Sequence, residues 1–428
     1  MKSIFITILL SLMTISTFAV GTIVYVNQNS TAASDDNAGT SMESPWLTLN
    51  PSKWTDNMTI HIANGTYTIS ERIAILNDNI TMIGESRSGV ILQSMDDVAF
   101  AAETTGNTLF QLSGKTVSFS TMTIKNVRNN ILKLGGAFDV IAGGNLTLND
   151  VTLTNLITAQ GTWEGGGAII VRGGTLNVEN CTFEGCQSNF GGAIMSFTNA
   201  TMSANTVNIS KSRFINNLNP KLAFFTGTHY GGAINLTGEG TFNIDQCYFE
   251  GNQSKVNTSN TGTATGGAIM VRLNPNVTST LNVTNSVFYR NESDGAGSVL
   301  AIGGNGLNTS SVFNLKLSNN VFYQNKGNVY SGTAANTLAL NSAGVMYTGN
   351  FILANNTFFQ NYNTDRATSA SIVLQAMPVS AYFVNNLMND NEVTGVTLYG
   401  LSCLAVTNSA TLRRFKGNIF NHIGGALS

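Results

Sequence analysis

Apolar and polar residues alternate along short segments of this chain, and the segments return as a repeated unit. Each unit has two alternating apolar residues, a short polar step, a Phe and, in most copies, an Asn three residues later; one copy runs through Leu176, Val178 and Phe183. The later copies centre on Phe214, Phe249, Phe288, Phe322, Phe358, Met388 and Phe420. A period of two predicts β-strands, and a return every roughly 30–40 residues is typical of a solenoid whose coils bury their apolar faces on one another.

The Phe and Asn positions of the unit predict two columns of stacked side chains. Alternation along a strand places the Phe column inside the coil, and Asn tolerates left-handed backbone, so the Asn column is expected to mark a corner. The Phe column is Phe183, Phe214, Phe249, Phe288, Phe322 and Phe358, and the Asn column is Asn217, Asn252, Asn291, Asn325 and Asn361. We expect Phe288→Ala to cost about 3–5 kcal/mol and Asn291→Ala about 1–3 kcal/mol.

A second signature, Gly-Gly-Ala followed by an apolar residue, stands beside the Phe unit. Copies begin at Gly135, Gly166, Gly191, Gly231 and Gly266, with a degenerate copy at Gly295 and a last one at Gly424. Glycine permits a bend and the close approach of neighbouring coils, so this step predicts a second corner. Together the patterns predict an all-β fold, a right-handed single-stranded parallel β-helix of about a dozen coils.

Three regions are expected along the chain. Lys2 precedes an apolar run, and the small-residue pattern ending at Ala19 predicts a secretory signal peptide over residues 1–19. An uncleaved membrane anchor is the alternative, although the run is shorter than the roughly 20 apolar residues that a span needs. Residues 20–58 are expected to form an N-terminal strand, loop and cap, and residues 59–428 the parallel β-helix. No second span is expected, so the protein should be free of a transmembrane segment after signal cleavage.

Residues 24–92 resemble the first turns of secreted pectin lyase-like β-helices. The elements that carry this resemblance are, in order, a YV strand, the segment DDNAGT...SPWLTL, the strand IHIANGTY and the strand ITMIGES. The Gly-Gly-Ala copies and F-x-x-N copies such as Phe214/Asn217 are similar to the repeats of the chlamydial polymorphic membrane proteins. This second resemblance implies a β-helical surface protein.

Composition and charge limit the expected partners. The chain has 428 residues, of which 42% are hydrophobic and 10% charged, with a net charge of −2. A nucleic-acid-binding surface is basic, so nucleic acid is not an expected partner. We expect a secreted, extracellular or cell-surface protein whose partner is an extracellular glycan or a surface protein. Sequons at positions such as Asn64, Asn208, Asn235, Asn252 and Asn291 suit a secreted glycoprotein, although a chain this rich in Asn, Ser and Thr gains nearly as many by chance.

Four cysteines leave two alternatives open. Cys181 and Cys247 hold the same place two coils apart, roughly 9.6 Å at a strand spacing of about 4.8 Å, which exceeds the reach of a disulfide. A bond between Cys181 and Cys186 is one alternative, and small buried side chains that fill stacked columns are the other. Cys403 has no assigned partner.

Candidates for ligand contact come from an uneven loop and two arginines. Long loops of a solenoid project from one face, where ligands often bind, and one such loop follows Phe214. The two arginines follow Gly-Gly-Ala at equivalent places, three coils or about 14 Å apart. The candidates are Arg172, Arg272, Phe224, His229 and Tyr230. An anionic chain could lie across both arginines; solvated arginines on an outer strand are the alternative.

Machinery for cleaving polysaccharides is incomplete in the sequence. Asn363-Thr364-Asp365 matches one polygalacturonase motif, but Asp96 and Asp97 are some nine coils or roughly 40 Å away, too far to share a substrate bond. The segment with Glu71 and Arg72 resembles the opening of pectin methylesterases, whose downstream carboxylates and arginine have no counterpart. The three histidines are scattered, so no catalytic residue, metal site or cofactor is expected.

These observations favour a non-catalytic β-helix repeat protein with an adhesion, matrix or glycan-binding role. A polysaccharide-active enzyme, whether lyase, hydrolase or esterase, is the alternative. The sequence stops at Ser428, at the start of a coil. An open solenoid end exposes apolar core and unpaired strand edges, so self-association through the C-terminal end is a further expectation.

Overall fold

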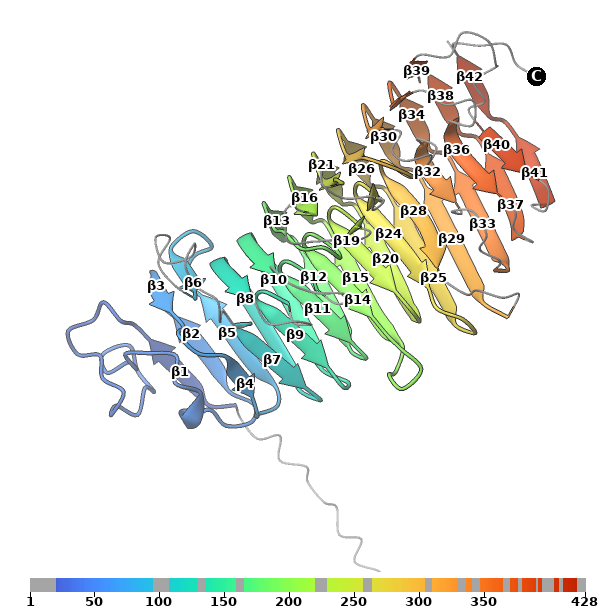
Figure 1. Ribbon diagram of the computed structural model, residues 1–428. Helices are drawn as coiled ribbons and strands as arrows, with labels where there is room; N and C mark the ends of the chain where they lie inside the picture. Colours follow the sequence, from blue (N-terminus) through green and yellow to red (C-terminus); the bar gives the residue numbers. More distant parts are fainter. Residues whose placement is uncertain are drawn as a thin grey trace, which may run out of the picture.

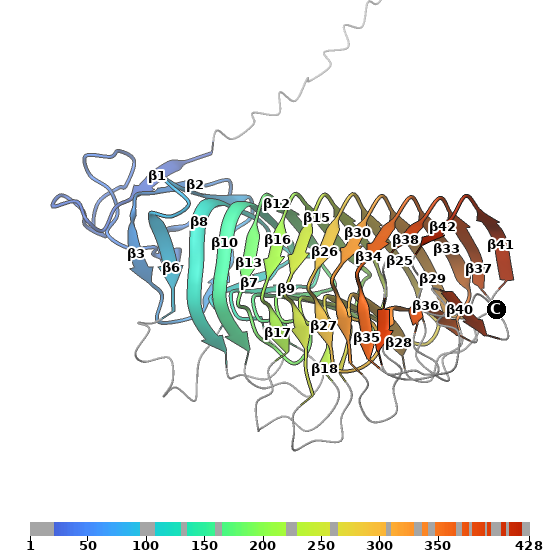
Figure 2. The same ribbon diagram turned by 90° about the horizontal axis from the view of Figure 1, so that it is seen from above.

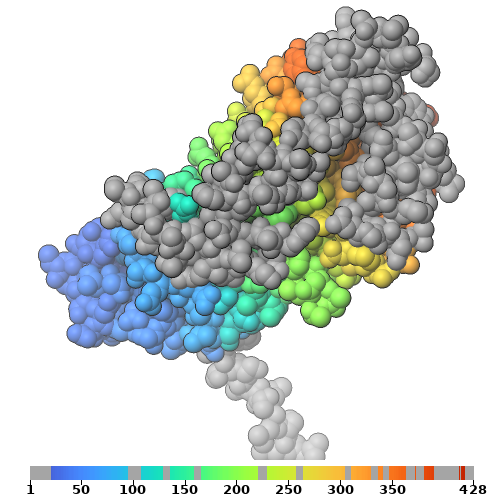
Figure 3. Space-filling model, viewed as in Figure 1, coloured from blue at the N-terminus to red at the C-terminus, as the bar shows by residue number. Residues whose placement is uncertain are grey.

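The computed structural model describes residues 21–94, 108–129, 135–158, 165–219, 229–256, 264–304, 310–328, 336–340, 347–364, 370–375, 379–389, 392–394, 404–407 and 411–421. These residues wind into an elongated parallel β-helix, along which the sequence advances from one end to the other (Figures 1 and 3). The predicted all-β solenoid is confirmed. One short helical turn, η1 (Pro51–Lys53), is described, and no helix within these ranges is long and apolar enough to cross a membrane.

The largest sheet, sheet A, contributes a leading strand to each coil. These strands are β1 (Ile23–Val26), β2 (Thr59–Ile62), β5 (Ile80–Gly84), β8 (Thr116–Asn129), β10 (Asn145–Thr158), β12 (Thr175–Glu179), β15 (Asn205–Ser210), β20 (Gly240–Asp245), β25 (Thr278–Thr284), β29 (Val312–Ser318), β33 (Gly349–Ala354), β37 (Val379–Val384) and β41 (Thr411–Lys416). Each pairs in parallel with the next, as Val207 of β15 does with Phe242 of β20. Their apolar residues alternate into the core.

A second, shorter strand of sheet A follows in most coils, and from β13 onward it carries the Phe of the repeat or, in β38, Met388. These strands are β3 (Gly65–Thr68), β6 (Val90–Gln93), β13 (Thr182–Glu184), β16 (Arg213–Ile215), β21 (Tyr248–Glu250), β26 (Val287–Tyr289), β30 (Val321–Tyr323), β34 (Thr357–Phe359), β38 (Leu387–Asn389) and β42 (Ile419–Asn421). Seen from above, they follow one another along one side of the solenoid (Figure 2). β8 and β10 are long enough to cover both positions.

The remaining sheets complete each coil. Sheet B has eleven described strands: β4 (Ile73–Ile75), β7 (Phe110–Ser113), β9 (Phe138–Ile141), β11 (Ile169–Arg172), β14 (Ile194–Phe197), β19 (Ile234–Thr237), β24 (Ile269–Leu273), β28 (Leu300–Gly304), β32 (Asn336–Leu340), β36 (Ala370–Gln375) and β40 (Leu404–Thr407). Sheet C consists of β17 (Leu218–Asn219), β22 (Gln253–Ser254), β27 (Glu292–Ser293), β31 (Lys326–Gly327), β35 (Tyr362–Thr364) and β39 (Glu392–Thr394). β18 (His229–Tyr230) pairs with β23 (Ala264–Thr265).

The Phe column forms a continuous stack in the core, as the repeat predicts. Phe183, Phe214 and Phe249 have successive ring centroids 4.7 Å apart, at angles of 0° and 5° between ring planes. Phe288, Phe322 and Phe358 continue the stack at 4.7, 5.2 and 4.4 Å. All six rings are at most 1% exposed. These spacings match the usual distance between paired strands, so each ring fills the space beneath the next.

The Asn column forms a buried amide ladder, but the left-handed residue lies one position earlier. Asn217, Asn252, Asn291, Asn325 and Asn361 are fully buried and hydrogen-bonded from one coil to the next. The residues with positive φ are the ones before them, namely Asn216, Gly251, Arg290, Gln324 and Gln360. The prediction that the Asn column itself adopts left-handed backbone is therefore wrong. The preceding residue makes the bend, and the Asn satisfies the polar groups that the bend turns inward.

The Gly-Gly-Ala step makes the corner before sheet B, and its two glycines have different tasks. Gly231 and Gly266 have φ of 69° and 68°, in the left-handed region that favours glycine. A Cβ at Gly232 would collide with the carbonyl oxygen of Gly267 in the next coil. The first glycine therefore permits the bend, and the second permits the close approach of the coils.

A loop covers the open edge of the first strand, β1. Tyr25 N donates to Gly39 O, Trp46 N to Tyr25 O, and Asn27 N to Trp46 O. Trp46 is 3% exposed and Trp54 is 5% exposed, so both indoles close the end of the core. The predicted signal peptide over residues 1–19, and the C-terminal step from Gly424 to Ser428 on which the self-association prediction rests, lie outside the described residues.

Candidate functional site

Arg172, at the end of β11 on the outer face of sheet B, forms an ion pair. Its Nη2 donates to both carboxylate oxygens of Asp139 on β9 at 2.8 Å, and Gln111 Nε2 donates to Asp139 Oδ2 at 2.8 Å. The Asp139 side chain is fully buried and that of Arg172 is 17% exposed. The solvated-arginine alternative is thus wrong for Arg172. Its charge is balanced by a buried carboxylate, which would be left unpaired if an anionic ligand took the guanidinium.

Arg272 and Tyr230 lie together on the same side of the molecule. The guanidinium of Arg272 lies over the Tyr230 ring, 5.3 Å from its centroid, and the Tyr230 ring is 5.5 Å from that of Phe190. The apolar residues packed on the outside of sheet B form two small clusters, Ile170, Phe190 and Met195, and Met270, Ala296, Ala301 and Ala339, and Tyr230 packs against both. Tyr230 thus forms part of a second apolar layer, and Arg272 lies on its ring.

His229 points away from Tyr230 and is enclosed. It is 1% exposed, and within the described part of the chain neither ring nitrogen has a hydrogen-bond partner. Burial lowers the pKa of His229, because the charged imidazolium loses its hydration there. The side chain is therefore neutral and is not placed to contact a ligand. Phe224, the remaining candidate, lies outside the described residues.

A charged cluster on the outside of sheet C has no counterpart in the sequence predictions. Lys255 Nζ lies 2.6 Å from Glu292 Oε1 and 3.3 Å from Asp294 Oδ1, and Asn328 Nδ2 donates to both carboxylates at 2.7 and 3.0 Å. Burial alone would raise the pKa of Glu292, but the hydrogen bonds from Lys255 and Asn328 outweigh it and lower the pKa. Glu292 is thus held ionised at neutral pH.

The polysaccharide-cleaving motifs are not assembled in the described part of the chain. Glu71 and Arg72 line an open cavity of about 370 Å³ beside Tyr67, whereas Asp96, Asp97 and Asp365 lie outside the described residues. The described ranges contain no group of three or more His, Cys, Asp and Glu side chains placed to hold a metal ion.

Three of the four cysteines are described, and all three are free thiols. Cys181, Cys186 and Cys247 are at most 2% exposed and form no disulfide. Burial raises the pKa of each thiol to about 12, so they are protonated and unreactive at neutral pH. The alternative of small buried side chains in stacked columns is therefore confirmed, and the Cys181–Cys186 disulfide is not formed. Cys403 lies outside the described residues.

The exposure of each Asn side chain decides which sequons could carry a glycan. Asn235, Asn252 and Asn291 are fully buried, and a glycan on any of them would have no path to solvent. Asn64, in the loop after β2, is exposed. A glycosylated form of this protein therefore has to carry its sugars on exposed sequons such as Asn64.

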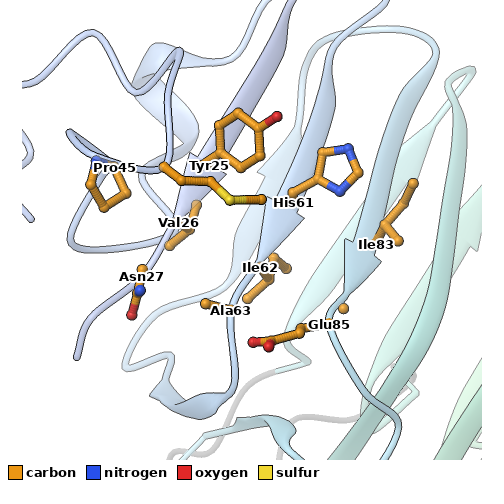
Figure 4. Close-up of a pocket in the computed structure, with 11 residues that line it drawn as sticks. Tyr25, Val26, Asn27, Pro45, His61, Ile62, Ala63, Ile83 and Glu85 are labelled. Carbon is orange, nitrogen blue, oxygen red and sulfur yellow. The ribbon is translucent and has the colours of Figure 1, made fainter. Parts of the chain in front are cut away.

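An open cleft of about 300 Å³ lies at the N-terminal end, on the outer face of sheet A (Figure 4). Tyr25 of β1, His61 of β2 and Ile83 of β5 occupy the same outward position on adjacent strands. The Tyr25 and His61 rings are stacked, with centroids 5.4 Å apart and 21° between their planes. Met42 and Pro45, from the loop that covers β1, also line the cleft, and Met42 is 70% exposed.

Polar groups lie at the edge of this cleft. Asn27 and Glu85 line it, and Glu85 points its carboxylate along the edge beneath Ala63 (Figure 4). Glu85 Oε2 accepts a hydrogen bond from the backbone N of Asn64 at 2.8 Å, which fixes the carboxylate. Sequence reasoning missed this site because its residues belong to four separate segments, and their only common signal is the strand register.

No protein-family model matches this chain, and no curated protein matches it. Among solved structures, the catalytic domain of a GH87 α-1,3-glucanase in complex with tetrasaccharides is similar over 93% of this chain and 69% of that chain, with 12% identity and a TM-score of 0.45. The GH136 lacto-N-biosidase from Eubacterium ramulus is similar over 94% and 68%, with 11% identity and a TM-score of 0.46. Pectin methylesterase PemA from Erwinia chrysanthemi is similar over 89% and 92%, with 13% identity and a TM-score of 0.26. The similarity to the repeats of chlamydial polymorphic membrane proteins stays a prediction.

Proposed function

We propose that this protein is a non-catalytic β-helix repeat protein of the cell surface or extracellular space, and that it binds a glycan in its N-terminal cleft. The observation that carries the proposal is the stacked Tyr25–His61 pair in a cleft that Met42, Glu85 and Asn27 also line. Sites for small ligands combine an apolar or aromatic floor with a few placed polar groups. This cleft has both.

A sugar ring suits such a lining because its two sides differ. One side carries C–H groups, which pack on aromatic rings and on a thioether, and the hydroxyl groups around its rim hydrogen-bond to carboxylate and amide oxygens. The cleft volume of about 300 Å³ is at the lower end for ligand sites, which start at about 300 Å³. A chain end or a short branch fits this volume better than the middle of a long polymer.

Binding without hydrolysis is favoured by the carboxylates of the cleft. Glycoside hydrolysis uses two carboxyl groups, about 5–9.5 Å apart, on either side of the bond that breaks. Among the described residues that line the cleft, Glu85 is the one acid. Its carboxylate accepts a hydrogen bond from Asn64 N, and its oxygens can also accept hydrogen bonds from sugar hydroxyl groups.

A glycan array with purified protein tests this proposal. We expect selective binding to a group of related glycans, at least tenfold weaker for Tyr25→Ala and weaker for Glu85→Gln. Tyr289→Ala, which removes a half-exposed tyrosine far from the cleft, is the matched control and should bind normally. Thermal melting shows whether each variant is folded. Absence of binding by the parent protein, or equal binding by a folded Tyr25→Ala variant, would contradict the proposal.

The enzyme alternative has one specific observation in its favour, the two carboxylates held by Lys255. Glu292 and Asp294 are close enough to share that ammonium group, but the lowered pKa of Glu292 makes it a poor general acid. We expect no unsaturated products, reducing ends or methanol from pectin, pectate or related polymers, with or without calcium. Products that the parent protein releases and Glu292→Gln does not would establish the enzyme instead.

A further inference from the structure

Four consecutive coils of sheet A carry the same two polar residues on their outer face. In each, a Thr and an Asn are separated by one buried apolar residue, and they face outward. The pairs are Thr175/Asn177 on β12, Thr206/Asn208 on β15, Thr241/Asn243 on β20 and Thr280/Asn282 on β25. The register aligns them into two parallel rows, here called the Thr row and the Asn row.

Hydrogen bonds within the Asn row fix the orientation of its amides. Asn208 Nδ2 donates to Asn177 Oδ1, Asn243 Nδ2 to Asn208 Oδ1 and Asn282 Nδ2 to Asn243 Oδ1, each at 2.9 Å. An amide has two N–H donors and two acceptor lone pairs, and this ladder uses one of each in its interior members. The remaining donor and acceptor therefore recur in the same orientation in successive coils, with their rotamer entropy already lost.

The Thr row repeats a hydroxyl and a methyl group beside the amides. Thr175, Thr206 and Thr280 are half-exposed, and Thr241 is exposed. A β-branched side chain has few χ1 rotamers in a strand, so these groups are also ordered before a ligand arrives. All eight side chains are uncharged. The nearest charged residues are Lys316, which pairs with Asn282 at the end of the Asn row, and Glu179 and Asp245, which stand one row further along their strands.

These rows are in unbroken register and evenly spaced. The register from β12 to β25 has no bulge, and the Phe rings of the same coils stack at 4.7 Å with only 0°, 5° and 10° between ring planes. Within a strand, residues two apart are about 6.6 Å apart. The surface is thus a two-dimensional grid of fixed hydrogen-bonding groups.

A grid of this kind fits a ligand that is itself periodic and uncharged. Hydrogen-bonded oxygens lie about 2.75 Å apart, and water coordinates its neighbours tetrahedrally, so two ice oxygens that share a neighbour are about 4.5 Å apart. The coil spacing of 4.7 Å exceeds this by about 0.2 Å, which accumulates to about 0.6 Å over three intervals, a small part of the 2.75 Å bond.

We propose that the Thr and Asn rows form an ice-binding surface, on which ordered water bridges the side chains to the ice lattice. A glycan is a poorer fit, because none of the eight positions carries an aromatic ring. The surface is also distinct from the cleft, which is formed by β1, β2, β5 and the loop that covers β1. This inference does not depend on the proposed function.

Ice-affinity partitioning and inhibition of ice recrystallisation test the surface. We expect the parent protein to enter growing ice and to inhibit recrystallisation at micromolar concentration. Thr241→Lys and Thr280→Lys, which place a charge on the Thr row, should each weaken inhibition at least tenfold. Val321→Lys adds the same charge to an exposed position on β30, outside the rows, and should have no effect; melting curves confirm that all variants are folded.

Several results would overturn the proposal. A parent protein no more active than serum albumin would do so, as would equal activity of a folded Thr241→Lys variant. Asn208 and Asn282 stand in sequons, and a glycan on either in the secreted protein, detected by mass spectrometry, would cover the rows. Loss of glycan-array binding in Thr241→Lys, without an effect on ice, would assign the rows to a glycan instead.

Discussion

The buried amide ladder from Asn217 to Asn361 is here called the corner ladder, and each of its asparagines joins three coils. Asn291 Nδ2 donates to Phe249 O in the preceding coil and to Asn325 Oδ1 in the following one, both at 3.0 Å. Its Oδ1 accepts from Asn252 N at 3.1 Å and from Asn252 Nδ2 at 2.9 Å. One amide thus satisfies two backbone groups that the bend leaves without strand partners.

The first prediction ranks the two core columns. Asn291→Ala removes the hydrogen-bond partners of a backbone carbonyl, a backbone N–H and a side-chain amide. Each buried polar group left without a partner costs about 1–3 kcal/mol. We therefore expect a loss of at least about 3 kcal/mol, equal to or larger than that of Phe288→Ala at about 3–5 kcal/mol. The sequence alone predicts the reverse ranking, with the smaller loss for Asn291→Ala. Urea unfolding measures both.

The matched control for this comparison is Asn282→Ala, which removes an outward amide. Asn282 makes one ladder bond to Asn243, and water replaces it, so the change should cost less than about 1 kcal/mol. If Asn282→Ala and Asn291→Ala destabilised the protein equally, burial would not explain the contribution of the corner ladder to the free energy of unfolding.

The second prediction concerns pH and His229. Burial holds its folded-state pKa below the ordinary value of about 6.5, so the unfolded state binds the proton more readily. The stability from the neutral imidazole is fully present above about pH 6.5 and is lost as pH falls through the folded-state pKa. Urea midpoints at pH 8 and 5 should therefore differ less for His229→Phe than for the parent. Tyr230→Phe, the control, keeps the imidazole and should retain the parent's difference.

At the scale of the element, strand type and facing could be predicted from the sequence, but contacts between coils could not. The period of two placed the Phe column inside, since a strand has only two faces. The ion pair of Arg172 with Asp139 depends on which residues of successive coils are in register, and loops of unequal length hide this in the sequence. The Tyr25–His61 cleft was missed for the same reason. The predicted position of the left-handed residue was wrong. The prediction chose Asn because Asn tolerates left-handed backbone, but in the structure other residue types, such as Arg290 and Gln324, adopt it.

The third prediction separates the two uses of glycine at the corners. Gly232→Ala should force two coils apart, because the new Cβ would collide with Gly267 O, and we expect a loss above about 2 kcal/mol. Gly185 has φ of 62° but open space around its Cβ position, and Arg290 occupies the equivalent corner of a later coil. Gly185→Ala should cost only the left-handed strain of about 1–2 kcal/mol. Thermal melting of both variants measures the two losses of stability. A larger loss for Gly185→Ala than for Gly232→Ala would contradict the separation of the two glycine roles.

At the scale of the whole molecule, ladders run along the axis while each coil contacts its neighbours. The Phe stack and the corner ladder cross consecutive coils without interruption from Phe183 to Phe358 and from Asn217 to Asn361. Arg87 also links coils near the N-terminal end. Its guanidinium donates hydrogen bonds to Asp150, Thr152 and Thr182 on adjacent coils at 2.8–2.9 Å. Stability is then a sum of coil and interface terms, as in other solenoids.

The fourth prediction follows from this one-dimensional coupling. Phe249→Ala opens a cavity that costs about 3–5 kcal/mol, and the rings of Phe214 and Phe288 on either side each lose one of their two stacking partners. Hydrogen exchange should become at least about a hundredfold faster in β16, β21 and β26, with the change fading over two or three coils in each direction and leaving β2 and β5 as protected as in the parent. Equal loss of protection from β2 to β38 would show instead that the solenoid unfolds as one cooperative unit. In that case the ladders would couple all coils and not only neighbours.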